Sequence, residues 1–374
     1  MKKRIVLTGG GSGGHVYPLL AVADELRRLA PDGDSSRREK LKLFYVGPRD
    51  SWSEEFESRE IKIYRIAGAK LRRYFDPRNL IDIPKFFIGF FQALVRLYFL
   101  MPDLIFSKGG TGALPVVFAA RFYLIPVIIH DSDSIPGLVN RISSRFAKKI
   151  FISFRTAADY FRGREVELVG NPIRLEMLLS RPPSTETAKT RIRLKSEEPL
   201  VVFMGGSQGA VPINDFVFGN FEKLAAVAQI FHQVGTINLN EAERLQNSND
   251  RYRYGGLLDA EQMKAVLAAA DVVVSRAGSG AIFEIASFGK PSILIPLPEA
   301  ASDHQRVNAY EYARNGAAIV IEQSNLSFGI IKLEIEKILN SPAVREEMSR
   351  AARSFAKPDA AEVIAQQILG FRKP

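Results

Sequence analysis

Two glycine-rich loops are the first segments of this sequence that could do chemistry. One reads Gly9-Gly10-Gly11-Ser12-Gly13-Gly14 and satisfies the spacing G-x-G-x-x-G, and the other reads Gly205-Gly206-Ser207-Gln208-Gly209-Ala210. Glycines let the backbone turn tightly and approach a ligand, and the exposed amides at the start of a following helix attract negative charge. Either loop alone could serve only tight strand–helix packing, but the two together favour a pyrophosphate ligand.

Proton-transfer chemistry has two candidate residues. His15 stands at the mouth of the first loop, where an imidazole could take a proton from an attacking hydroxyl, or could only orient a phosphate or the loop. Asp133, in the run His-Asp-Ser-Asp at 130–133, is a second possible proton acceptor. The first loop alone would also fit an NAD-dependent oxidoreductase. The second loop, His15 and Pro18 disfavour that interpretation.

Alternating strands and helices must position these loops. Continuous apolar strands separated by helices indicate parallel sheets that helices cover on both faces. Each half of the chain opens with a strand, a glycine loop and a helix, so the sequence predicts an α/β protein of two Rossmann-like, doubly wound domains. The expected strands are 4–8, 41–46, 104–106, 127–130, 149–152, 200–204, 228–233, 272–275, 292–296 and 318–321.

The length of 374 residues suits two domains of ordinary size. Gly170-Asn171-Pro172 and the polar stretch 181–195 separate the two series of strands, which predicts a boundary near residue 170. A last helix near 360–371 is expected to cross back to the first domain. The predicted first domain is therefore 1–170 together with 360–374, and the second is 171–359.

Positive charge is concentrated in the first domain. Residues 1–170 hold 28 Lys and Arg against 18 Asp and Glu, whereas residues 171–374 hold 23 of each. This asymmetry indicates an anionic partner, although a solubilising face would also explain it. Because no nucleic-acid motif is present, the pattern favours an anionic membrane surface over nucleic acid.

An apolar run suggests where a membrane would be met. Residues 86–95, FFIGFFQALV, carry no charge and lie between Lys85 and Arg96. The run is too short to span a bilayer, which takes roughly 18 to 20 residues, but an apolar face framed by basic residues can lie on an anionic surface. Some of its phenylalanines are expected in the core and some outside. The predicted membrane patch comprises Arg72, Arg73, Phe86, Phe87, Phe90 and Phe91.

The sequence resembles the MurG family of cell-wall glycosyltransferases over nearly its whole length. The order and spacing of the matching strings are far more specific than any one of them. The strings are GGGSGGHVYPLLAVADEL at 9–26, IPVIIHDSDSIPGLVNRISSRFAKKI at 125–150, GNPIR at 170–174, GGSQGA at 205–210, HQVG at 232–235, SRAGSGAIFEIASFGKPSILIPLP at 275–298 and DHQRVNA at 303–309.

The resemblance implies a GT-B fold, in which two Rossmann-like domains face each other across a cleft. It implies transfer of N-acetylglucosamine from UDP-GlcNAc to the 4-hydroxyl of N-acetylmuramoyl-pentapeptide on undecaprenyl pyrophosphate (lipid I). The reaction inverts the anomeric centre without a metal or cofactor, and the protein is peripheral on the cytoplasmic face of the cell membrane. The absence of cysteine, which excludes thiolate metal sites, agrees with this expectation.

The resemblance also implies site residues. Glu284 matches a glutamate that accepts hydrogen bonds from both ribose hydroxyls, and Gln305 matches a glutamine that binds the donor sugar. Asp133 matches an asparagine that contacts this sugar, and His15 and Asp133 are the candidate catalytic residues. The other expected donor contacts are Ser12, Gly13, Gly14, Arg174, Ser207, Gln208, Leu258 (through its backbone), Ser279, Gly280 and Ala281.

The chain departs from the family at a few positions, and two rival functions remain. His-Asp-Ser-Asp at 130–133 replaces the commoner His-Glu-Gln-Asn, Ser12 replaces a Thr, and Ala281 stands where Thr is common. One rival is a related GT-B transferase with another lipid acceptor, because acceptor choice lies in variable loops. The other is a UDP-GlcNAc 2-epimerase, which would need acidic catalytic residues at the donor site.

Overall fold

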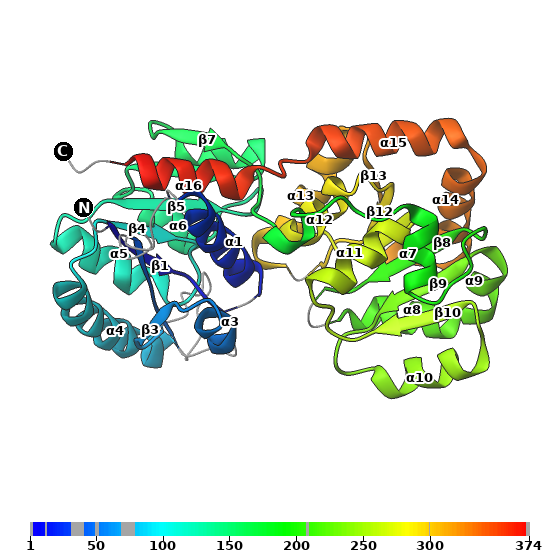
Figure 1. Cartoon of the computed structure of the whole chain (residues 1–374), viewed down its shortest axis with the longest axis horizontal. Helices are drawn as coiled ribbons and strands as arrows, with labels where there is room; N and C mark the ends of the chain where they lie inside the picture. Colours follow the sequence, from blue (N-terminus) through cyan, green and yellow to red (C-terminus); the bar gives the residue numbers. More distant parts are fainter. Residues whose placement is uncertain are drawn as a thin grey trace. The chain divides into compact units, whose positions relative to one another are not determined.

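The structure is a computed structural model that describes residues 3–11, 13–30, 41–48, 52–68, 79–206, 209–298 and 300–371. The chain divides into two compact units (Figure 1): Met1–Leu175 with Pro358–Pro374, and Glu176–Lys357. Residues 171–175, 358 and 359 belong to the first unit, although the sequence predicts a second domain of 171–359. For 171–175 the reason is tertiary, since Asn171 bonds Lys108 and the Arg174 guanidinium lies over the Tyr17 ring.

The first unit is built on a seven-stranded parallel sheet. Its strand order changes direction between β1 and β4, which makes this the topological switch point, where ligands of open α/β sheets bind. In spatial order the strands are β3 (Lys62–Arg65), β2 (Leu41–Gly47), β1 (Lys3–Thr8), β4 (Leu104–Ser107), β5 (Val127–Asp131), β6 (Lys149–Ile152) and β7 (Val166–Leu168).

Helices cover both faces of this sheet, because β1 sends alternate side chains to opposite sides. Ile5 and Leu7 join a core with the helices α1 and α16, whereas Val6 joins a second core with α4 and α5. Lys3 Nζ donates to the carbonyls of Leu369 (2.7 Å) and Phe371 (2.9 Å), which fastens α16 beside α1 (Figure 1). The helices are α1 (Gly13–Leu29), α3 (Ser53–Glu57), α4 (Asn79–Leu100), α5 (Ala113–Phe122), α6 (Leu138–Ser143), η1 (Arg155–Phe161) and α16 (Ala360–Gly370).

The second unit repeats the design with a six-stranded parallel sheet. The order is β10 (Tyr252–Gly255), β9 (Gln229–Gln233), β8 (Leu200–Met204), β11 (Val272–Ser275), β12 (Ser292–Leu294) and β13 (Ala318–Val320), with the switch point between β8 and β11. Its helices are η2 (Leu175–Met177, across the unit boundary), α7 (Thr185–Arg191), α8 (Val211–Gly219), α9 (Phe221–Val227), α10 (Leu239–Ser248), α11 (Ala260–Ala269), α12 (Ser279–Ser287), η3 (Ala301–Asp303), α13 (His304–Arg314), η4 (Gln323–Asn325), α14 (Phe328–Asn340) and α15 (Pro342–Phe355).

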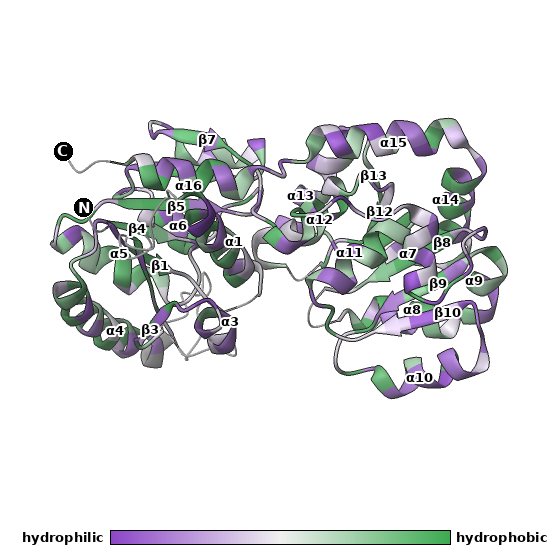
Figure 2. Cartoon of the chain, in the orientation of Figure 1, coloured by the Kyte–Doolittle hydropathy of each residue, from purple (hydrophilic) through white to green (hydrophobic). Residues whose placement is uncertain are grey.

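The predicted fold class, two parallel α/β sheets, is confirmed. The expected strands coincide with observed ones to within two residues at their ends, and their apolar composition is visible in Figure 2. Sequence reasoning missed three strands, β3, β7 and β10. All three lie at an edge of their sheets and are three or four residues long. They carry charged or half-exposed side chains, so they lack the continuous apolar pattern.

Candidate functional site

Two glycine loops meet at the switch point of the first unit. Gly110, after β4, has φ +84°, and a Cβ on it would lie 2.2 Å from the carbonyl oxygen of Gly10. Gly10 and Gly11, after β1, also have positive φ angles of 142° and 98°. Only glycine allows this close backbone contact and these angles without strain. The loop of the predicted fingerprint is therefore paired with the segment 109–112, which the motif analysis did not single out.

His15 lies in the first turn of α1, where it is half-buried, and the buried Gly13 and exposed Gly14 precede it. Ser12 lies outside the described residues. The guanidinium carbon of Arg174 stands 5.3 Å from the ring centroid of Tyr17, which lies two residues after His15 in the same helix. Four predicted residues, Gly13, Gly14, His15 and Arg174, thus belong to one region of the first unit.

A buried polar cluster follows β4 and β5 beside these loops. Lys108, which is 1% exposed, places Nζ 2.5 Å from His130 Nδ1 and 3.4 Å from Asn171 Oδ1, and it also bonds Ser132 Oγ. His130 Nε2 in turn lies 2.8 Å from the carbonyl of Gly170. The sequence analysis noted the string that contains His130 but missed Lys108. A lysine directly after a buried strand and before two glycines was the available signal.

Asp131 organises the segment that carries Asp133. Its Oδ1 accepts the backbone N–H of Asp133 at 3.1 Å, and its Oδ2 accepts from Gly137 N (3.2 Å) and Asn140 Nδ2 (2.9 Å). Both carboxylate oxygens of Asp131 are therefore occupied within the protein. Asp133, the other carboxylate of this segment, is half-buried and is the one predicted to accept a proton.

Burial and neighbouring charges shift the pKa values in this cluster. Burial lowers the pKa of Lys108 to about 7, although the Asp131 and Asp133 carboxylates oppose the shift. Burial and the Lys108 charge hold the pKa of His130 well below its usual range. Burial and the Asp133 charge raise the pKa of Asp131, against the hydrogen bond from Asn140. Strongly perturbed titratable groups of this kind concentrate at functional sites.

In the second unit the N-terminus of α12 is built to receive an anion. Gly278, the N-cap residue, gives no side-chain cap, and a Cβ on Gly278 or Gly280 would meet no atom within 4 Å. Ser279 Oγ is buried and has no hydrogen-bond partner among the described residues. Uncapped amides and an unpaired hydroxyl at a helix start are suited to a phosphate. Ala281 and Glu284 follow on the same helix, both half-buried.

The second glycine loop precedes α8, whose N-cap Ala210 gives no side-chain cap either. Gly209 has φ +77°, and a Cβ on it would lie 2.5 Å from the carbonyl of Val234, so the loop lies against the end of β9. Gln233, the last residue of β9, is buried with an unpaired Oε1. The sequence analysis did not propose Gln233. Ser207 and Gln208 lie outside the described residues.

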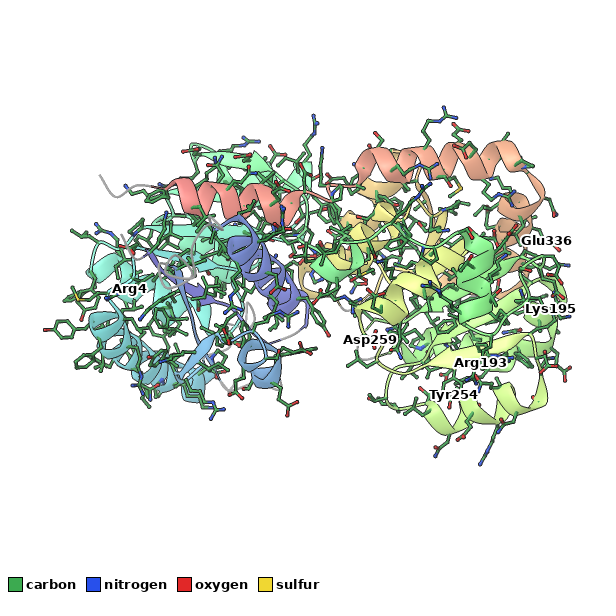
Figure 3. All side chains as sticks on the ribbon, viewed as in Figure 1. Arg4, Arg193, Lys195, Tyr254, Asp259 and Glu336 are labelled. Atoms are coloured by element: carbon green, nitrogen blue, oxygen red, sulfur yellow. The ribbon has the colours of Figure 1, made fainter. Side chains whose placement is uncertain are left out.

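Two other predicted donor residues lie near turns of the second unit. Gln305 Oε1 accepts the backbone N–H of Leu297 at 3.1 Å. Gln305 lies two residues after the consecutive left-handed residues Ser302 and Asp303. Leu258 is 6% exposed and its side chain belongs to the core, so only its backbone can face a ligand. The loop of Leu258 joins β10 to α11 and lies between Tyr254 and the helix cap Asp259, both of which are labelled in Figure 3. The loop borders a cavity of about 830 Å³.

The outer face of α4 is an apolar surface. Three of its residues, Ala93, Leu97 and Leu100, are buried in the sheet-facing core. The large apolar side chains exposed on the helix are Ile83, Phe87, Ile88, Phe91, Val95, Tyr98 and Phe99. Lys85, Gln92 and Arg96 are exposed as well, and Figure 2 shows α4 as largely hydrophobic. Phe86 and Phe90 are half-buried, whereas Arg72 and Arg73 lie outside the described residues. Within the described part of the chain, Asp82–Leu100 is the one helix long and apolar enough, by length and composition, to cross a membrane.

Comparisons with known proteins match both units. The glycosyltransferase family 28 N-terminal domain matches residues 5–152, and the C-terminal domain of that family matches residues 200–364. The UDP-N-acetylglucosamine–N-acetylmuramyl-(pentapeptide) pyrophosphoryl-undecaprenol N-acetylglucosamine transferase 3 of Bacillus thuringiensis is 36% identical over 98% of this chain and 99% of its own. A relative with the same name (without a number) from Clostridium kluyveri is 35% identical over 90% and 91%.

Solved structures agree. Acinetobacter baumannii MurG matches with a TM-score of 0.74 and 25% identity over 99% of this chain and all of its own. A UDP-GlcNAc 2-epimerase from Neisseria meningitidis, bound to UDP-GlcNAc, matches with a TM-score of 0.66 at 14% identity, covering 99% and 100%, which shows a shared fold alone. With both family domains matched and relatives of one name similar over nearly the full length, the chain belongs to the MurG family of N-acetylglucosamine transferases, within glycosyltransferase family 28.

Proposed function

We propose that this protein transfers N-acetylglucosamine from UDP-GlcNAc to the 4-hydroxyl of N-acetylmuramoyl-pentapeptide on undecaprenyl pyrophosphate, in peptidoglycan synthesis. The observation that carries the proposal is the 36% identity, over 98% of the chain, to a relative named for this reaction. Two anion-binding helix starts, one in each unit, are consistent with substrates that both contain pyrophosphate.

The second unit supplies the donor site in this proposal. The amides of Ser279, Gly280 and Ala281 and the unpaired Ser279 hydroxyl bind the UDP pyrophosphate. Glu284, one and a half turns along α12, accepts the ribose hydroxyls, and Gln305 binds the sugar. Backbone groups near Leu258 meet the uracil. The proposed donor contacts also include Gly13, Gly14, Asp133 and Arg174 of the first unit, and Ser12, Ser207 and Gln208, which lie outside the described residues.

The first unit supplies the acceptor site. In the chemical step the acceptor 4-hydroxyl oxygen attacks the anomeric carbon, the bond from that carbon to the phosphate oxygen breaks, and UDP leaves with the electron pair. Attack opposite to the leaving group inverts the centre. His15 takes the hydroxyl proton, with Asp133 as the competing base. The helix N-termini stabilise the charge that develops on the leaving pyrophosphate.

The membrane surface forms part of the proposal because the acceptor carries an undecaprenyl chain. The exposed apolar face of α4 provides a surface that can enter the interface of a bilayer. The positive surplus of residues 1–170 attracts anionic lipid. Because the opposite face of α4 packs in the core of the first unit, we propose a peripheral attachment at the cytoplasmic face of the cell membrane rather than a span.

One incubation separates this function from its rivals. Purified protein is given UDP-GlcNAc alone, with lipid I, or with another undecaprenyl-linked or diacylglycerol acceptor, and UDP and lipid products are measured. Transfer to lipid I alone is the expected result. Transfer to another lipid instead would identify a related transferase, and conversion of UDP-GlcNAc to its 2-epimer without an acceptor would identify an epimerase.

A further inference from the structure

A buried lysine joins three segments of the first unit, one of which carries Asp133. Lys108, after β4, bonds His130 at the end of β5, Ser132 in the loop that follows, and Asn171 before the unit boundary. We propose that Lys108 is a positioning residue of the transfer reaction, which holds the segment 130–133 and thereby places Asp133, the competing base and a proposed contact of the donor sugar. This inference rests on the proposed function.

The hydrogen-bond pattern shows which atoms carry protons. The carbonyl of Gly170 only accepts, so His130 Nε2, 2.8 Å away, carries the ring proton and Nδ1 presents its lone pair to Lys108. Ser132 Oγ donates to Asn171 Oδ1 at 2.9 Å and likewise presents a lone pair to Lys108. The ammonium thus gives one proton to each of three acceptors. A neutral amine has only two protons and would set its lone pair against one of theirs.

Stability alone does not account for a cation in this position. Removing an ammonium from water is costly, and replacing even a buried ion pair by apolar groups of similar volume is often neutral or stabilising. In the part of the chain that the structure describes, Lys108 contacts no carboxylate directly, and Asp131 and Asp133 attract it only through space. The positive charge instead lets Lys108 Nζ donate to three acceptors and so hold one loop in place.

Lys108 controls the position of Asp133 through a short chain of bonds. Lys108 bonds the side chains of His130 and Ser132. Asp131, which lies between these two residues in the sequence, accepts the backbone N–H of Asp133 at 3.1 Å. Asn140 Nδ2 ties the same loop to α6 by donating to the His130 carbonyl at 3.0 Å. When Lys108 is removed, residues 130 and 132 lose their common partner, and the backbone that places Asp133 can shift.

Lys108→Met tests this in the full chain, because methionine keeps the length of the side chain and removes its charge and all three donors. We expect kcat with UDP-GlcNAc and lipid I to fall about 30- to 100-fold, since a displacement of about 1 Å at a reacting group costs up to about 100-fold. The KM for UDP-GlcNAc should change less than about threefold, because the proposed donor residues lie mostly in the other unit.

Lys290→Met is the matched control. Lys290 is also a largely buried lysine, and burial lowers its pKa to about 8, but its Nζ donates to the carbonyls of Ala268 and Ala270, each at 2.9 Å, in the second unit. The kcat of its folded fraction should equal that of the wild type. Ser132→Ala, which removes one of the three acceptors, should lower kcat by a smaller factor than Lys108→Met. If Lys108→Met does not fold, Ser132→Ala serves as the test variant in its place.

A spectroscopic measurement makes the test independent of activity. Long-range ¹H–¹⁵N NMR of the full chain, labelled at its four histidines, reports which ring nitrogen carries the proton. His130 should be the Nε2–H tautomer both in the wild type and in Lys108→Met, because the Gly170 carbonyl remains its acceptor. The ¹⁵N shift of His130 Nδ1 should differ between the two proteins, because Lys108→Met removes the donor to that lone pair. Wild-type kcat in Lys108→Met, an unchanged Nδ1 shift, an equal loss in Lys290→Met, or wild-type kcat in Ser132→Ala when Lys108→Met does not fold would each overturn the proposal. An inactive wild type would instead refute the proposed function, and the Nδ1 shift would still show whether Lys108 holds His130.

Discussion

The exposed phenylalanines of α4 should hold the protein on lipid bilayers. Phe91 is 63% exposed and Phe99 is 76% exposed, whereas Ala93 and Leu97 on the opposite face of the helix are buried in the core. Changing Phe91→Ser together with Phe99→Ser therefore removes two largely exposed apolar side chains, which pack on the neighbouring rings of Phe90 and Tyr98 but do not belong to the core. The expected result is weaker binding to liposomes with no loss of fold.

The size of the effect follows from the exposed fractions. Full burial of a phenylalanine contributes about 1.5 to 3 kcal/mol. Scaled by exposure, the two side chains together contribute about 2 to 4 kcal/mol when both leave water on the membrane. That range corresponds to binding about 30- to 1,000-fold weaker in the double variant.

Liposome sedimentation, with anionic and with neutral lipid and at two salt concentrations, measures this effect. Leu333→Ser is the matched control, since Leu333 is also 63% exposed but lies on α14 of the second unit, and it should bind as the wild type does. Calorimetry should show unchanged UDP-GlcNAc binding in both variants. The reasoning is refuted if the double variant sediments like the wild type or if Leu333→Ser weakens binding equally.

A charge reversal separates the electrostatic contribution from the apolar one. Arg72→Glu with Arg73→Glu, at positions outside the described residues, should loosen attachment to anionic liposomes only. That contribution should also fade with salt, because charge is screened over about 8 to 10 Å near physiological ionic strength, whereas apolar burial is not. Sedimentation that is indifferent to lipid charge, to salt and to this reversal would leave the positive surplus as a solubility feature.

Three further predictions concern the donor, the base and acid stability. Glu284→Ala should weaken UDP-GlcNAc binding about tenfold to a hundredfold through lost charge-assisted hydrogen bonds, and unchanged affinity by calorimetry would reject the assignment. His15→Ala should lower turnover by about two to four orders of magnitude if His15 is the base. If His15→Ala stays active and Asp133→Ala is inactive, Asp133 is the base. Burial lowers the pKa of His232 to about 3, so the unfolded chain binds more protons below about pH 6.5 and stability should fall by about 3 kcal/mol at pH 4. Thermal melts of His232→Gln should show a flatter acid slope, and parallel curves would contradict this.

The parts of the fold that sequence reasoning recovered are those whose signal is local. An apolar run such as 200–204 that ends in glycines marks a buried strand and its loop, and the observed β8 has the same ends. Three edge strands, β3, β7 and β10, were missed because they keep charged residues, as the sequence KIYR of β3 shows. The fourth edge strand, β13, was expected because its sequence AIV is apolar. The assignment of residues 171–175 depended on contacts with residues far away in the chain, such as Tyr17, which no local pattern contains.

The sequence by itself determined the class of the protein. The glycine loops, the strand–helix alternation and the ordered family strings are read along the chain, and each of them depends on neighbours within a few residues. The comparisons confirm the family to which they point.

The tertiary structure decided what surrounds these motifs. Lys108 meets His130, Ser132 and Asn171 across 22, 24 and 63 residues, because a parallel sheet places the carboxyl ends of β4 and β5 side by side. Packing against the sheet likewise decided which phenylalanines of α4 face outward. The burial of Lys108, its lowered pKa and the positions of the protons around it are properties of the packed structure. The sheet and its loops bring together groups whose spacing in the sequence carries no periodic signal.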